Sequence, residues 1–126
     1  MPRTPNLALA PDRGAVLTKA ALRAAERLNL NGKQLSAILG VSEPTISRLK
    51  RGDTTLEAGS KTFEFAALLV RAYRSLDAIT GGDEAVARVW MTADNTALMG
   101  RPLDRMATIQ GLVDVTTYLD ARRAPI

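Results

Sequence analysis

The sequence predicts an all-α protein, and three observations lead to this prediction. Apolar residues recur at spacings of three and four, the period of a helix buried on one face. No two alternating segments joined by a hairpin turn occur in the 126 residues. Aromatic residues make up only 4% of the chain, so small aliphatic side chains supply most of its 46% hydrophobic content. Such side chains suit closely packed helices.

The N-terminal part is expected to hold a flexible arm over 1–14 and a helical bundle. The predicted helices of this bundle cover residues 15–30, 32–39 and 43–51. Asn31 is the expected N-cap of the second helix, and Gly40 ends it because a left-handed residue is needed there. Ser42 caps the third helix, and Pro44 lies in its first turn, where a missing N–H costs nothing. With the polar connector that follows, this first domain spans 15–60.

The remaining residues, 61–126, are expected to form a small helical domain attached through a long central helix. The predicted helices here cover residues 61–80, 84–91 and 109–122, with an irregular corner at 92–102. Apolar residues of the segment 61–80 cover more than one helical face, so it is expected to pack on both sides.

Composition excludes several classes of function. The chain has no Cys and no His, which argues against disulfides, zinc sites and Ser–His or Cys–His hydrolases. We therefore expect no enzymatic activity, no metal and no cofactor, although carboxylate-only chemistry would leave no visible signature. The longest apolar runs are too short to span a bilayer, and the N-terminus lacks the pattern of a secretory signal. The expected location is the cytoplasm, without a membrane partner.

Charge is distributed unevenly along the chain. Residues 1–60 contain nine Lys and Arg against five Asp and Glu, whereas residues 61–126 contain eight of each. The whole net charge of +4 therefore lies in the first part, which favours a polyanionic partner such as DNA for that part. A chance imbalance of four charges is the alternative.

Residues 35–49 fit a helix-turn-helix motif. Gly40 lies at the turn, and Ser36 is small where the two helices must approach each other. Aliphatic residues occupy the positions that would lock the two helices at a steep angle, namely Leu35, Leu39, Val41, Ile46 and Leu49. The alternative is a plain helical corner with a solvated basic surface.

A helix-turn-helix of this kind would place the start of its second helix in the major groove. Arg48 is the best candidate base reader, because its fork can bond guanine O6 and N7. Thr45 and Ser47 could reach a base or a phosphate. Glu43 could accept from a cytosine amino group or simply favour the helix N-terminus. The other candidate DNA contacts are Lys33, Gln34, Pro44, Lys50 and Arg51.

The stretch "LSAILGVSEPTISRLKRG" resembles the Xre, or phage-repressor-like, helix-turn-helix family. That family often has a phosphate-gripping Gln near the second position of the first motif helix, where this chain has Gly32. Gln34 or Lys33 then substitutes for it, or the contact is absent. If it is absent, a protein-binding module with a vestigial helix-turn-helix is a rival interpretation.

The later segments "LLVRAYRSLDAITGGDEAVARVWM", "DNTALMGRPLDRM" and "GLVDVTTYLDARR" resemble the toxin-binding domain of Xre/MbcA/ParS-type antitoxins. This resemblance implies a protein that neutralises a cognate toxin, commonly a RES-domain enzyme that degrades NAD. It also implies binding of the toxin through the C-terminal domain, and repression of the protein's own operon through the helix-turn-helix, usually by a homodimer. The rival is a plain repressor whose C-terminal domain only dimerises.

The end of the last helix and the tail are the main candidates for the toxin contact. A toxin that binds a dinucleotide must present cationic and polar groups around a deep pocket, which a protruding terminal carboxylate could enter. The candidate residues are Arg101, Tyr118, Arg122, Arg123, Ala124, Pro125 and Ile126. A frayed, idle terminus is the alternative for the tail, and a structural role in the corner is the alternative for Arg101.

Overall fold

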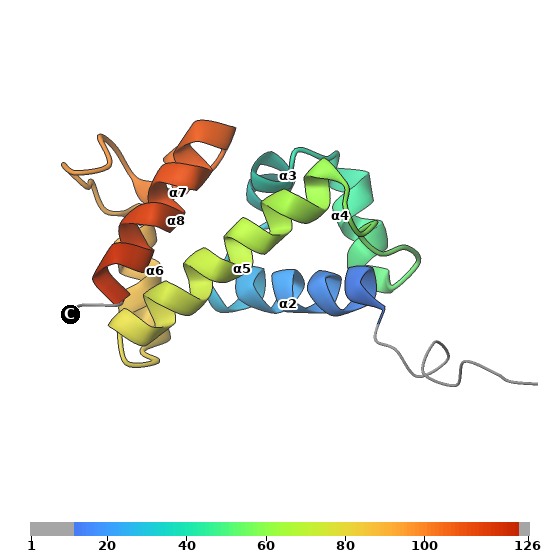
Figure 1. Ribbon diagram of the computed structural model, residues 1–126, viewed down its shortest axis with the longest axis horizontal. Coiled ribbons are helices and arrows are strands. Elements are labelled where there is room, and N and C mark those ends of the chain that lie inside the picture. The colour runs from blue at the N-terminus through green and yellow to red at the C-terminus, as the bar shows by residue number, and fades with distance from the viewer. Residues whose placement is uncertain (1–11, 124–126) are drawn as a thin grey trace, which may run out of the picture.

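The computed structural model describes residues 12–123, and these form seven helices in two groups (Figure 1). The helices are α2 (Arg13–Arg27), α3 (Gly32–Leu39), α4 (Glu43–Arg51), α5 (Lys61–Ile79), α6 (Glu84–Thr92), α7 (Pro102–Arg105) and α8 (Ile109–Arg123). No strand forms among the described residues, so the predicted all-α class is confirmed. Residues 1–11, most of the predicted arm, and the tail residues 124–126 lie outside the described part.

The first helix begins earlier than predicted. Asp12 caps α2, which starts at Arg13 and so includes the last two residues of the predicted arm. A side chain at Gly14 would lie 2.0 Å from the carbonyl oxygen of Leu56, so only glycine fits. Thr18 Oγ1 also accepts a hydrogen bond of 2.8 Å from the Leu56 backbone N–H. These contacts hold the connector between α4 and α5 against the start of α2.

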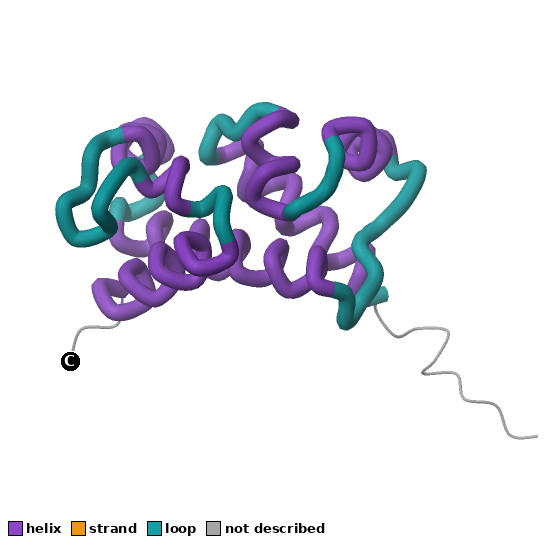
Figure 2. Tube along the Cα trace, turned by 90° about the horizontal axis from the view of Figure 1, so that it is seen from above, coloured by secondary structure: helices purple, strands orange, loops and turns teal. Residues whose placement is uncertain are grey.

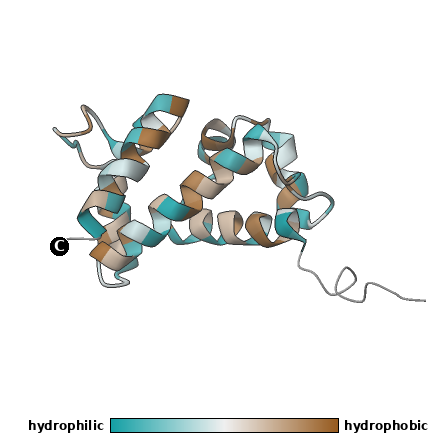
Figure 3. Ribbon diagram, in the orientation of Figure 1, coloured by the Kyte–Doolittle hydropathy of each residue, from teal (hydrophilic) through white to brown (hydrophobic). Residues whose placement is uncertain are grey.

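The central helix α5 links the two groups of helices. It packs against both α2 and α8, as its apolar pattern predicted. Figure 3 shows hydrophobic residues interspersed with hydrophilic ones along it. Ala66, Leu69 and Leu76 are almost fully buried along it. Burying a leucine side chain stabilises a fold by about 1.5–3 kcal/mol, so these positions contribute much of the stability of both groups. The connecting loops run around the outside (Figure 2).

The C-terminal group is held together by a close approach of α7 and α8. Thr108 caps α8, and its Oγ1 accepts from the Gly111 N–H at 3.0 Å. A Cβ at Gly111 would lie 1.7 Å from the carbonyl oxygen of Arg105, so α8 can approach the end of α7 this closely only at a glycine. The α8 residues Leu112 and Leu119 are buried against the rest of the group.

A buried polar link joins α5 to α8. Ser75 is fully buried, and its Oγ donates a 2.7 Å hydrogen bond to Asp120 Oδ1. The other carboxylate oxygen of Asp120 pairs with Arg71.

Within the described residues, no helix is long and apolar enough to cross a membrane.

Candidate functional site

The turn between α3 and α4 has the conformation that the sequence predicted. Gly40 adopts a left-handed φ of 70°, and its N–H donates to the carbonyl oxygen of Ser36 at 2.8 Å. The Ser42 hydroxyl accepts from the Thr45 N–H at 3.2 Å, and Pro44 lies in the first turn of α4. Both helix ends at the corner are therefore satisfied by the residues expected to do so.

The corner is locked by buried aliphatic side chains. The four fully buried members are Leu35, Leu39, Ile46 and Leu49, while Val41 is half-buried. Ser36 is half-buried, and its hydroxyl donates to the carbonyl oxygen of Lys33 at 2.8 Å. Burial on this inner side leaves the opposite side of α4 facing solvent.

The outward side of α4 brings the predicted base readers together. Six of its predicted DNA contacts are exposed: Glu43, Pro44, Ser47, Arg48, Lys50 and Arg51. Thr45 is half-buried, and its Oγ1 accepts a 3.0 Å hydrogen bond from Arg48 Nη2. The guanidinium that is best suited to read guanine is therefore held beside a hydroxyl that can bond a base or a phosphate.

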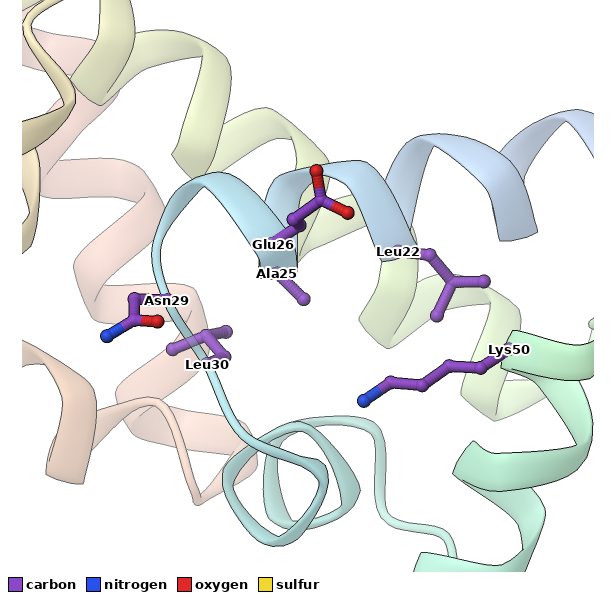
Figure 4. Close-up of a pocket in the computed structure, with 6 residues that line it drawn as sticks. All are labelled: Leu22, Ala25, Glu26, Asn29, Leu30 and Lys50. Atoms are coloured by element: carbon purple, nitrogen blue, oxygen red, sulfur yellow. The ribbon is translucent and has the colours of Figure 1, made fainter.

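The two cations at the end of α4 have different surroundings. Lys50 lines a hollow of about 470 Å³ between α2 and α4, and its ammonium group extends into that hollow (Figure 4). Arg51 instead pairs with Asp53 through a 2.9 Å contact from Nε to Oδ2. Arg51 can neutralise a phosphate fully only when its ion pair with Asp53 is broken.

The start of α3 contains a reciprocal cap. The Asn31 side chain accepts from the Gln34 N–H at 2.7 Å, as the predicted cap requires. In return, the Gln34 side-chain oxygen accepts from the Asn31 N–H at 2.8 Å. The side-chain oxygen of Gln34 is thus engaged in the cap, which leaves its amide NH₂ as the group that could donate to a phosphate. The neighbouring Lys33 is exposed.

The corner before α7 is closed by backbone and ionic contacts. Asn95 and Gly100 exchange two backbone hydrogen bonds of 3.1 and 3.2 Å. Arg101 Nε and Nη2 donate to the two oxygens of Asp104 at 2.9 and 3.0 Å. Hydrogen bonding to Arg101 lowers the pKa of Asp104. The same hydrogen bond, together with the negative charge of Asp104, raises the pKa of Arg101. Arg101 is thus paired within the corner but remains exposed.

Comparison with known proteins gives two family matches in sequence. Residues 7–71 match the antitoxin Xre-like helix-turn-helix domain, which covers more than half of the chain. Residues 75–124 match the antitoxin Xre/MbcA/ParS C-terminal toxin-binding domain. The chain belongs to the Xre/MbcA/ParS-type antitoxins. A search of curated proteins returned no match to it.

The two domains of this antitoxin share α5. The break between the two matched regions falls inside this helix, so one continuous element carries both a DNA-binding and a toxin-binding domain. Residues 75–79 of α5 belong to the toxin-binding match, and α5 also packs against α2 and α3 of the helix-turn-helix domain.

The predicted toxin contacts of the antitoxin are only partly brought together. Tyr118 stacks on Trp90 with ring centroids 6.3 Å apart, and the guanidinium of Arg122 lies 4.4 Å from the centre of the Tyr118 ring. Arg123 is exposed at the end of α8. Arg101 lies in the corner before α7, where it pairs with Asp104. Ala124, Pro125 and Ile126 lie outside those residues.

Two features of the antitoxin were not predicted. The role of Gln34 in the cap was signalled by its position three residues after Asn31, the spacing of a capping box. Met99 adopts a left-handed φ of 59° and is 88% exposed. Nothing in the sequence signals this conformation, because methionine has no preference for it.

Proposed function

We propose that this antitoxin binds and neutralises a cognate toxin of the RES, NAD-degrading class, and represses its own operon as a homodimer. It acts in the cytoplasm and has no catalytic activity of its own. The observation that carries the proposal is the order of the two matched domains on one central helix, a DNA-binding domain followed by a toxin-binding domain. The resemblance of the C-terminal segments to antitoxins of RES-domain toxins supports the toxin class.

The DNA-binding link rests on α4. Arg48 reads a guanine, with Thr45 and Ser47 contacting a base or a phosphate beside it. Lys33, Gln34, Lys50 and Arg51 contact phosphates, which fix the position of the protein without reading sequence. The excess of positive charge within residues 1–60 supports DNA as the partner of this domain.

The toxin-binding link rests on the region matched at residues 75–124. Here the antitoxin buries a protein–protein interface over the toxin and keeps substrate out of its active site. The Tyr118–Arg122 cluster and the tail 123–126 contribute to this contact. Toxin binding then changes how two antitoxin copies lie on two half-sites, because half-site spacing is a geometric constraint.

The function is tested by measuring NAD in cells that express the protein encoded next to this chain. Expression of the neighbour alone is expected to deplete NAD, and co-expression of the antitoxin is expected to restore it. If the neighbour is toxic and neutralised while NAD stays constant, the toxin belongs to another class. If the antitoxin affects only transcription from its promoter, the plain repressor is the correct function.

A further inference from the structure

Exposed apolar side chains concentrate in the toxin-binding domain. Among the described residues, seven large apolar side chains are exposed, and one of them, Val16, lies in the helix-turn-helix match. The other six lie within the region matched at 75–124, and they are Ile79, Val86, Val89, Met99, Ile109 and Val113. A continuous patch of exposed apolar groups marks an interaction surface, so each of these six residues is a candidate for such a contact.

Met99 is the most exposed of these side chains, and its backbone conformation is unfavourable. The loop from α6 to α7 projects from the end of the molecule (Figures 1 and 2). The two hydrogen bonds between Asn95 and Gly100, and a third from the Leu98 N–H to Asn95 Oδ1 at 3.1 Å, hold this loop closed. Leu98 is buried, whereas the left-handed Met99 faces solvent. A strained residue that contributes nothing to the core points to a role in binding.

A groove lies between this loop and α8. It has a volume of about 320 Å³ and is lined by Leu98, Met99, Thr117 and Tyr118, together with an ion pair. The pair joins Arg105 Nη2 to Asp114 Oδ2 at 2.8 Å. One turn before Thr117 on the same side of α8 lies the exposed Val113. The groove is therefore apolar along its loop side and polar along part of its rim.

We infer that this groove is a toxin contact of the antitoxin, and that it receives an apolar side chain of the toxin, with Met99 packing over it. The inference rests on the proposed function, since the occupant is the cognate toxin. Two observations support this occupant: the groove lies inside the toxin-binding match, and its composition is that of an interface with an apolar centre and a polar rim. Its lining includes Tyr118, which the proposed function places in the toxin contact.

The test measures the affinity of full-length variants for the purified protein encoded by the neighbouring gene. Met99→Gly removes the side chain at a position where glycine is conformationally preferred, so the variant is expected to keep its thermal stability. We expect its affinity to fall by about tenfold or more, as for a central apolar contact. Thr117→Lys, which places a charge in the groove, is expected to weaken binding further.

Two matched controls place the contact. Val16→Ser changes an exposed apolar residue in the helix-turn-helix half, and Val89→Ser changes one on α6. Both are expected to retain wild-type affinity. If Met99→Gly and Thr117→Lys both bind with unchanged affinity, the groove is not a toxin contact. A loss of affinity with Val89→Ser alone would also overturn the inference and would place the contact on α6.

The oligomeric state separates the toxin from a second copy of the chain. The mass of each antitoxin variant alone is expected to equal that of the wild type. A fall in that mass with Met99→Gly would show that the groove binds another antitoxin copy and would overturn the inference. Wild-type antitoxin that fails to bind the neighbour at all contradicts the proposed function itself, whereas equal binding by wild type and variants contradicts only the groove.

Discussion

Arg88 on α6 donates a 3.0 Å hydrogen bond from Nε to the carbonyl oxygen of Arg27, the residue with which α2 ends. The contact crosses from the toxin-binding domain to the helix-turn-helix. Glu84, also on α6, pairs with Arg27 at 3.0 Å and with Arg88 at 3.4 Å. A cation at a helix C-terminus satisfies unpaired carbonyls and interacts favourably with the helix dipole. These contacts reinforce the apolar packing that joins the two halves.

Removal of this cap should loosen the junction of the domains. Arg88→Ala is expected to lower the free energy of unfolding by about 1 kcal/mol, a typical value for a partly exposed hydrogen-bonded cap. Arg88→Lys keeps the positive charge but loses the paired guanidinium donors, so its free energy of unfolding should lie between those of Arg88→Ala and the wild type. Urea denaturation measures both, with the exposed Arg23→Ala as a control on α2. Equal stability of Arg88→Ala and wild type would show that packing alone joins the domains.

Arg48 is expected to read sequence. Arg48→Ala should cost about 1–3 kcal/mol at the cognate operator and relax the preference at one base position. Lys50→Ala should instead weaken binding about equally on all sequences and reduce the salt dependence by about one phosphate contact. Binding to operator and random DNA over a salt series distinguishes the two effects. A uniform loss with Arg48→Ala would make Arg48 a phosphate contact.

Asp53 is expected to restrain DNA binding. Its carboxylate pairs with Arg51, a proposed phosphate contact, and so adds a negative charge beside that contact. Asp53→Asn removes that charge and frees the guanidinium, so affinity for random DNA should rise by a few-fold at low salt. The exposed carboxylate of Glu57, in the same connector, provides the matched variant Glu57→Gln. A gain of the same size in both variants would indicate a general charge effect and not release of Arg51.

The end of the chain is expected to contribute to neutralisation. Deletion of residues 122–126 removes Arg122 from the face of Tyr118 together with the residues that follow it. Rescue of cells that express the neighbouring protein should fall, while binding to operator DNA should stay unchanged. Survival of poisoned cells at the wild-type level would show that the tail is idle.

Local signals predicted the elements of this fold well. The left-handed Gly40, the Ser42 cap and the buried Leu35, Leu39, Ile46 and Leu49 follow from spacing and from helix-end chemistry. The start of α2 was placed too late, because prolines and the absence of a period concealed a helix start that Asp12 caps. The requirement for glycine at positions 14 and 111 depends on backbone that lies elsewhere in the chain.

The functional surfaces were predictable to different degrees. Seven of the nine DNA-contact candidates lie on α4, and Lys33 and Gln34 lie on the preceding helix α3, so one local motif indicates all of them. The hydrogen bond from Arg88 to Arg27 joins residues that are 61 positions apart. The groove beside Met99 is lined by residues of the loop between α6 and α7 and of α8. No local pattern encodes such juxtapositions, and a left-handed methionine has no sequence signature. The structure was needed to find them.

The central claim is that this antitoxin binds its cognate toxin through the domain matched at residues 75–124. Co-expression with the neighbouring gene, followed by purification through a tag on one protein and determination of the native mass, tests it most directly. We expect both proteins to purify together as a complex of defined stoichiometry that contains more than one antitoxin copy. Recovery of the antitoxin at its own mass, with the neighbour absent, would contradict the claim.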